Sequence, residues 1–110
     1  MNSEYIGEAL GTFVFVYIAL TQTEPITIAV GLFVGILIAM TFRSKSFLNP
    51  GIAIGNYFGA YCDPDNKSKY ITGDEAVKYI GAEFVGVALS LAVFYMYVNQ
   101  PAINNTPKLV

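Results

Sequence analysis

Three apolar stretches dominate the pattern of hydrophobic and polar positions. They cover residues 5–22, 26–42 and 76–98, and the middle stretch contains no charged residue. A helix needs about 20 residues to cross the roughly 30 Å hydrocarbon core of a bilayer. The pattern therefore predicts three transmembrane helices, with the lipid bilayer as the first partner of the chain.

A fourth apolar segment, residues 47–61, is too short to cross a bilayer as a helix. It contains Asn49, a favoured N-cap residue, followed by Pro50, which suits the first turn of a helix. The segment has no charged face, which a helix lying flat on a membrane normally carries. We therefore expect a re-entrant half-helix over about residues 50–61 rather than an interfacial helix.

The remaining segments are polar. Turn-forming and charged residues fill the loop 62–75, and the tail 99–110 holds two prolines. The chain, residues 1–110, is thus predicted to form one all-α membrane domain of three spans and one half-helix.

Small residues recur four positions apart in every apolar segment. This spacing lets helix backbones approach closely in a membrane, although glycine is also common in membrane helices generally. The glycines that we expect at helix crossings are Gly7, Gly11, Gly31, Gly35, Gly55, Gly59 and Gly86.

Basic residues are distributed unevenly along the chain. Five of the six Lys and Arg residues lie at positions 43 to 78, where the second apolar stretch is joined to the third. Cytoplasmic loops of membrane proteins are enriched in Lys and Arg. We therefore expect the N-terminus and the loop 43–78 on the cytoplasmic side and the C-terminus on the opposite side.

The composition excludes several classes of function. Charged residues make up 13% of the chain, whereas soluble domains have about 25%. Histidine is absent and Cys62 is the single cysteine, so no His-based triad, His-ligated zinc site or internal disulfide can form. Six basic residues and a net charge of −2 do not suit a nucleic-acid groove. We predict no enzyme, no cofactor and no metal site.

Four motifs, in this order, resemble those of the aquaporin, or major intrinsic protein, family. They are Glu8–Thr12 (EALGT), Gly31, Asn49–Gly55 (NPGIAIG) and Tyr79–Gly86 (YIGAEFVG). The third resembles the first Asn-Pro-Ala box of the family. The resemblance covers nearly the whole chain but only the first of the family's two inverted repeats, so it implies half of an aquaporin-like bundle.

The resemblance also implies which residues line a pore. Asn49, Pro50 and Gly51 would form the box at the start of the half-helix, with the amide of Asn49 facing the pore. The alternative for Asn49 is a plain N-cap. Val30 and Ile52 match pore-lining positions of the family.

Two acids lie inside apolar stretches, Glu8 in the first and Glu83 in the third. An intramembrane carboxylate costs at least about 2.5 kcal/mol unless it has a partner. The resemblance implies that Glu8 braces the backbone of the loop 44–48. We expect Glu83 to pair with amides of the same loop, to be protonated, or to pair with another subunit.

The chain departs from the family at several positions. Gly51 replaces the alanine of the box, Phe47 replaces a histidine, and Glu83 replaces a glutamine. The second repeat is missing, and with it the arginine of the selectivity filter. Ile52 stands at the corresponding position and cannot supply a guanidinium, so this chain alone cannot assemble a water-selective filter.

Three interpretations of function remain open. The chain could form a pore for water or a small neutral solute by pairing with another half, as a homo-oligomer or with another membrane subunit. It could be a non-conducting structural protein of a virion or organelle membrane, or the N-terminal fragment of a longer channel. The bias of basic residues argues against insertion in both orientations. Asn49 and Glu8 are costly to keep in a mere anchor, which favours the channel.

Overall fold

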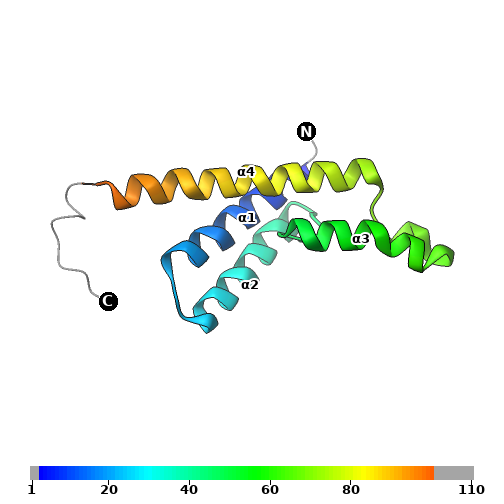
Figure 1. The fold of residues 1–110 in the computed structure, drawn as a ribbon, viewed down its shortest axis with the longest axis horizontal. Coiled ribbons are helices and arrows are strands. Elements are labelled where there is room, and N and C mark those ends of the chain that lie inside the picture. Colours follow the sequence, from blue (N-terminus) through cyan, green and yellow to red (C-terminus); the bar gives the residue numbers. More distant parts are fainter. Residues whose placement is uncertain (1–2, 101–110) are drawn as a thin grey trace.

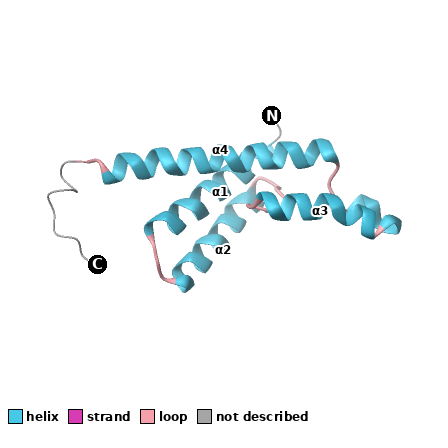
Figure 2. Ribbon diagram, in the orientation of Figure 1, coloured by secondary structure: helices cyan, strands magenta, loops and turns pink. Residues whose placement is uncertain are grey.

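The protein is a bundle of helices in the computed structural model, which describes residues 3–100. This part of the chain contains no strand, and its elements are α1 (Ser3–Thr21), α2 (Pro25–Thr41), α3 (Pro50–Cys62), the short 3-10 helix η1 (Pro64–Lys69) and α4 (Gly73–Val98) (Figure 2). The all-helical class predicted from the sequence is confirmed. Two helices, α1 and α4, are long and apolar enough to cross a membrane, while α2 is an apolar helix of 17 residues.

The predicted boundaries differ from the observed ones mainly in the loop 62–75. The loop contains η1, and α4 begins at Gly73, three residues before the predicted start at residue 76. A capping box causes the earlier start: the Thr72 hydroxyl accepts from the backbone N–H of Glu75, whose carboxylate accepts from the N–H of Thr72. Most of the predicted polar tail 99–110 lies outside the described residues.

Helices α1 and α2 form an antiparallel hairpin joined by three residues, 22–24. They cross at Gly11 and Gly35, where a Cβ on Gly11 would lie 2.5 Å from the carbonyl oxygen of Gly35. Two further glycines of the hairpin would also clash with the opposite helix or its end if they carried a side chain: Gly7 with Phe42 and Gly31 with Ile18. The small residues spaced four positions apart therefore lie on the faces of α1 and α2 that touch, as expected.

Helix α4 packs across α1 on the other side (Figure 1). A Cβ on Gly86 would lie 2.5 Å from the carbonyl oxygen of Ala9. One turn further, the buried hydroxyl of Ser90 donates to the carbonyl oxygen of Phe13 at 2.7 Å. The small side chains of Gly86 and Ser90 thus let the backbones of α1 and α4, the two longest helices, come into direct contact.

Helix α3 runs alongside the first half of α4 in the opposite direction (Figure 1). Ala53 belongs to the same buried cluster as Ala76 and Tyr79 of α4. On this side Gly59 meets the ring of Tyr70, whereas a Cβ on Gly55 would meet nothing within 4 Å. The packing role predicted for Gly55 is wrong within the single chain, because Gly55 lies on the face of α3 that points away from α4.

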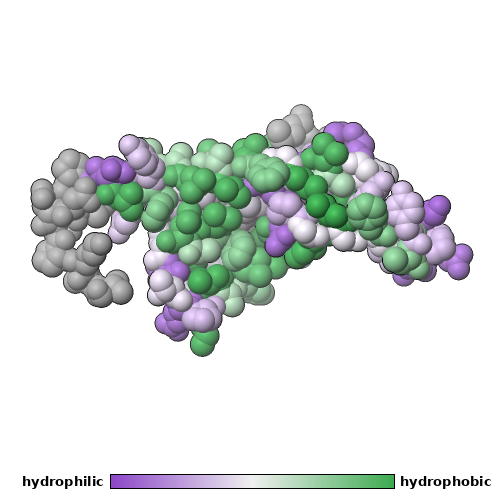
Figure 3. Space-filling view, in the orientation of Figure 1, coloured by the Kyte–Doolittle hydropathy of each residue, from purple (hydrophilic) through white to green (hydrophobic). Residues whose placement is uncertain are grey.

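The outer surface of the bundle is largely apolar. Large hydrophobic side chains are exposed on every α-helix, including Phe33 and Phe84, each 61% exposed. Figure 3 shows hydrophobic residues over much of the helices. Hydrophilic residues lie at the η1 end, at the α1–α2 connection, at the two ends of α4 and in a small patch near the centre of this view. An apolar belt with polar ends suits a lipid environment.

Candidate functional site: a buried polar cluster at the start of α3

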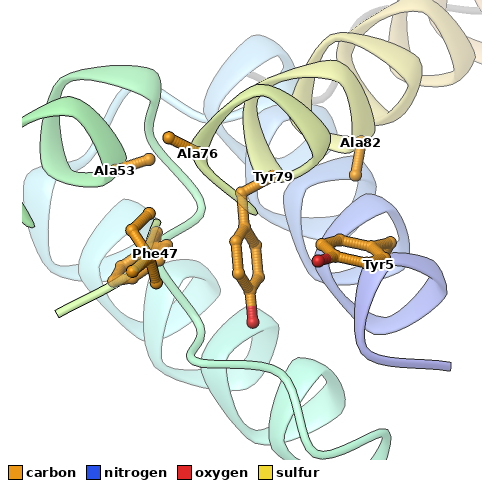
Figure 4. Packing of buried hydrophobic residues seen from close by; sticks show 7 residues of the cluster. Tyr5, Phe47, Ala53, Ala76, Tyr79 and Ala82 are labelled. Atoms are coloured by element: carbon orange, nitrogen blue, oxygen red, sulfur yellow. The ribbon is translucent and has the colours of Figure 1, made fainter. Parts of the chain in front are cut away.

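The packing around Tyr79 fixes the loop that leads into α3. The Tyr79 ring stands between Tyr5 and Phe47, with ring centroids 5.0 and 4.9 Å away (Figure 4). Both pairs meet edge to face, the arrangement that aromatic rings favour. The Tyr79 hydroxyl accepts from the backbone N–H of Lys45 at 3.2 Å, so α4 holds this loop by both packing and a hydrogen bond.

The loop itself has an unusual backbone. Arg43, Ser46 and Leu48 have φ of 63°, 59° and 56°, in the left-handed region that non-glycine residues rarely adopt. Each such residue costs on the order of 1–3 kcal/mol and persists only when its surroundings fix it. The loop therefore depends on the groups that hold it.

Glu8 of α1 is the principal group that holds the loop. Its side chain is completely buried, and one carboxylate oxygen accepts from the Ser44 hydroxyl at 2.7 Å. The other oxygen accepts from the backbone N–H of Leu48. The Ser44 hydroxyl also accepts from the N–H of Ser46 at 3.0 Å. The contact predicted between Glu8 and the loop 44–48 is present. We call Glu8, Ser44, Leu48 and Tyr79 the inner cluster.

The inner cluster sets the start of α3. The Asn49 side-chain oxygen accepts from the N–H of Gly51 at 2.7 Å, and Pro50 occupies the first helical position. This is an N-cap, as predicted. Asn49 is exposed and Ile52 is 55% exposed. The side-chain oxygen of Asn49 is engaged by Gly51, and its amide nitrogen forms no hydrogen bond within residues 3–100. The helix terminus beside it carries about half a positive charge.

The structure separates Val30 from this site. Val30 is exposed on α2, and its neighbour Gly31 packs against Ile18 near the end of α1. Gly35, one turn later, lies beside Leu48: a Cβ on Gly35 would be 3.0 Å from a methyl carbon of Leu48. Ile52 lies in the first turn of α3, beside Asn49, whereas Val30 lies next to the residue that packs against the end of α1.

Glu83 is buried without a hydrogen-bond partner. Its side chain is 0% exposed, and neither carboxyl oxygen is bonded within residues 3–100. The bracing of the loop predicted for Glu83 is therefore not observed. The reason is that Glu8 already accepts from Leu48, while Tyr79 accepts from Lys45. The nearby Thr12 hydroxyl is also buried and unpaired in this part of the chain.

A second polar cluster lies at the opposite end of α3. The Asp63 carboxylate accepts from the Asn66 amide and the Tyr70 hydroxyl, each at 2.9 Å, and Asn56 accepts from the N–H of Ile71 at 2.8 Å. The hydrogen bonds from Asn66 and Tyr70 lower the pKa of Asp63, and the bond to Asp63 raises the pKa of Tyr70. We call these five residues the outer cluster.

Sequence reasoning missed two members of the inner cluster. In the sequence, Tyr79 is one of several aromatic residues in an apolar stretch, and nothing in the stretch itself marks it as polar in function. It lies four positions before Glu83 and thus on the same side of α4. Ser44 reads as an ordinary loop residue. For Tyr79, its place one turn from Glu83 was the available signal, since an acid inside an apolar bundle needs polar partners. Ser44 gave no local signal, because it lies 36 residues from Glu8 in the sequence.

Comparisons with protein-family models, with curated proteins and with solved structures found no match for this chain.

Proposed function

We propose that the chain is half of an aquaporin-like channel, with three spans and one re-entrant half-helix. The observation that carries the proposal is the start of α3. The exposed Asn49 caps this helix through its side-chain oxygen, which leaves its amide nitrogen free to donate, and Glu8 of α1 holds the preceding loop from inside the bundle. This arrangement agrees with the motifs by which the sequence resembles the channel family.

Helix lengths support a half-helix that enters the membrane. With 13 residues, α3 is roughly 20 Å long and cannot cross a bilayer, whereas the 26 residues of α4 extend for roughly 39 Å. The start of α3 lies near Tyr79, six residues into α4, which places it about 9 Å along that helix. The hairpin connection then makes α2 return through the bilayer beside α1.

The chemistry of the site suits water or a small neutral solute. A free amide N–H₂ group donates to a passing oxygen atom, and the positive end of a helix repels cations. One chain supplies one such group. The pore would be completed by another half, which would cover the exposed face that contains Asn49, Ile52 and Gly55. That half would be a second copy or another membrane subunit.

A second candidate is a structural membrane protein that does not conduct. One observation favours it: Arg43 and Lys45 are both exposed in the loop that leads into α3. Charged side chains prefer the membrane–water interface. If the interface lies at this loop, α3 rests outside the hydrocarbon core and the fold serves as an anchor.

Osmotic shrinkage of reconstituted vesicles tests the channel. Vesicles with the wild-type protein should shrink faster in hyperosmotic buffer than empty vesicles. The matched variants are Asn49→Ser, which keeps a good N-cap but lacks the amide, and Asn49→Leu, which lacks both. We expect Asn49→Ser to fold and to lose most of the added permeability. Wild-type vesicles that shrink no faster than empty ones, with folded and oligomeric protein, would reject the channel and leave the anchor.

Gly55→Leu tests the pairing separately. A Cβ at position 55 would have no atom within 4 Å in the described part of the chain, so the thermal stability of the single chain should change little. If another half covers this face, the same variant should lose the oligomer that the wild type shows in mild detergent. An oligomer unchanged by Gly55→Leu would exclude this face as the pairing surface.

A further inference from the structure

Two acids are buried in the seam between α1 and α4 with different surroundings. Glu8 and Glu83 are both 0% exposed. Two donors, the Ser44 hydroxyl and the Leu48 N–H, point at Glu8. Within the described residues no group donates to Glu83, including the Thr12 hydroxyl, which is itself unpaired.

The packing of α4 places Glu83 beside Glu8. Tyr79, Glu83 and Gly86 lie on one side of α4. Tyr79 reaches the loop that Glu8 braces, and Gly86 lies against Ala9, the neighbour of Glu8 in α1. Glu83 lies between these two contacts. Its neighbours are the Glu8 carboxylate and the backbone of Asn49, and neither forms a hydrogen bond with it by distance and angle.

No basic side chain in the described residues lies close enough to neutralise the negative charge of Glu8 and Glu83. On α4, Lys78 is exposed and pairs with Asp74 at 3.0 Å, the one ion pair within residues 3–100. Arg43 and Lys45 of the loop are exposed. The other titratable groups nearby are acidic or phenolic: Glu4 and Tyr5 of α1, and Tyr79 of α4. Helix α2 contains no titratable residue, and those of α3 lie in its second half.

Two adjacent carboxylates that are shielded from water cannot both stay ionised, because the repulsion and the lost hydration are uncompensated. A proton or a metal cation must offset one charge. No group of three or more metal-ligating side chains exists in the described chain. We propose that Glu8 and Glu83 form a buried proton-binding site, in which Glu83 holds the proton and donates it in a hydrogen bond to Glu8.

This assignment gives one Glu83 oxygen a hydrogen-bond partner and leaves the pair with a single negative charge. The O–H of Glu83 supplies the donor that a free lone pair of Glu8 can accept, and it removes the unpaired charge from Glu83. The remaining negative charge stays on Glu8, where Ser44 and Leu48 already donate to it. The inference does not depend on a pore, because it concerns the α1–α4 seam of the single chain.

The site has a consequence for stability. The folded chain binds a proton that the unfolded chain releases above a pH of about 4.3. Folding is therefore stabilised most at acid pH on this account, and the contribution of the site is lost as the pH rises. Release of the proton places a second negative charge beside Glu8 and weakens the contact between α1 and α4.

Infrared spectroscopy of the purified protein tests the site directly. At pH 7 the wild type should show the carbonyl band of a protonated carboxylic acid, and the band should disappear on titration to alkaline pH. Glu83→Gln, which keeps a donor but cannot ionise, should lack the band, while Glu24→Gln at an exposed acid should retain it. The thermal midpoint of the wild type should fall between pH 7 and pH 10 more than that of Glu83→Gln.

If Glu83→Gln does not fold, the wild-type spectrum alone tests whether the site holds a proton. Absence of the band at pH 7 would overturn the proposal. So would a thermal midpoint that rises when choline chloride is replaced by sodium or potassium chloride, because a bound cation would then balance the charge. A band retained in folded Glu83→Gln would also overturn it, since another acid would hold the proton.

Discussion

The two ends of α3 are held by polar clusters that differ in their access to water. In the inner cluster a buried carboxylate, Glu8, bonds groups that lie 36 and 40 residues away in the sequence. In the outer cluster the polar side chains are half-buried, and the bonded residues are at most 15 positions apart. Water can replace a lost partner in the outer cluster but not in the inner one. The inner cluster should therefore be far less tolerant of substitution.

Loss of the Glu8 carboxylate should have the largest effect. Glu8→Leu leaves the Ser44 hydroxyl and the Leu48 N–H unpaired, at a cost of about 1–3 kcal/mol for each buried group. It also releases a loop with three left-handed residues. Thermal unfolding in one detergent should show a marked drop in the midpoint. Glu8→Gln keeps one acceptor oxygen and should melt between the wild type and Glu8→Leu; equal melting of the two variants would contradict the bracing role.

Removal of the Tyr79 hydroxyl should have a smaller effect. Tyr79→Phe keeps the ring between Tyr5 and Phe47 but leaves the N–H of Lys45 without its acceptor. We expect a loss of roughly 1 kcal/mol, the usual net value of one hydrogen bond. Hydrogen exchange at the Lys45 amide should also become faster. An unchanged exchange rate in the folded variant would show that this bond does not hold the loop.

Substitution in the outer cluster should cost less than substitution of Glu8. Asn56→Leu removes the acceptor for the N–H of Ile71, but this end of the molecule is half-buried and water can take the place of the amide. We expect less than roughly 1 kcal/mol. Asn56→Asp keeps the acceptor and serves as the matched control in the same melting assay. A drop as large as that of Glu8→Leu would remove the distinction between the two clusters.

Acid should have the smallest effect, through Asp63. Because its pKa is lowered in the folded chain, its hydrogen bonds stabilise the fold above the unfolded value of about 3.9 and are lost as the pH falls through the folded value. Asp63→Asn should therefore show a shallower loss of thermal midpoint between pH 5 and pH 3 than the wild type. Asp65→Asn, at the exposed acid two residues away, is the matched control and should lose as much thermal midpoint as the wild type over the same pH range. Identical curves for all three proteins would show that Asp63 does not contribute.

The sequence predicted the helices because their signals are local. Apolar periodic stretches, the Asn49–Pro50 start and the glycine spacing each act within one or two turns. The start of α4 was placed three residues late because the capping box of Thr72 and Glu75 lies in a polar segment. The capping box is itself a local pattern, so the sequence contained the information needed.

The candidate site was predicted only in part because its contacts join distant segments. Glu8 was identified from the cost of a buried acid, and its contact with the loop 44–48 is present. The structure gives Glu83 no such contact, because Tyr79 and Glu8 already satisfy the loop. Neither the left-handed backbone of Leu48 nor the open face around Gly55 leaves a sequence signal, since both arise from the way the helices pack.

The depth of α3 in the bilayer tests the central claim most directly. Spin labels at Ile54 and Tyr61, each substituted by cysteine in a Cys62→Ser background, would lie on the same exposed face two turns apart. Their relative accessibility to oxygen and to a water-soluble nickel chelate gives their depths. The account predicts that position 54 lies deeper than position 61 by up to about 10 Å, the rise of seven helical residues. Equal depths, or free access of the nickel chelate to both labels, would contradict it, because α3 would then lie on or outside the membrane.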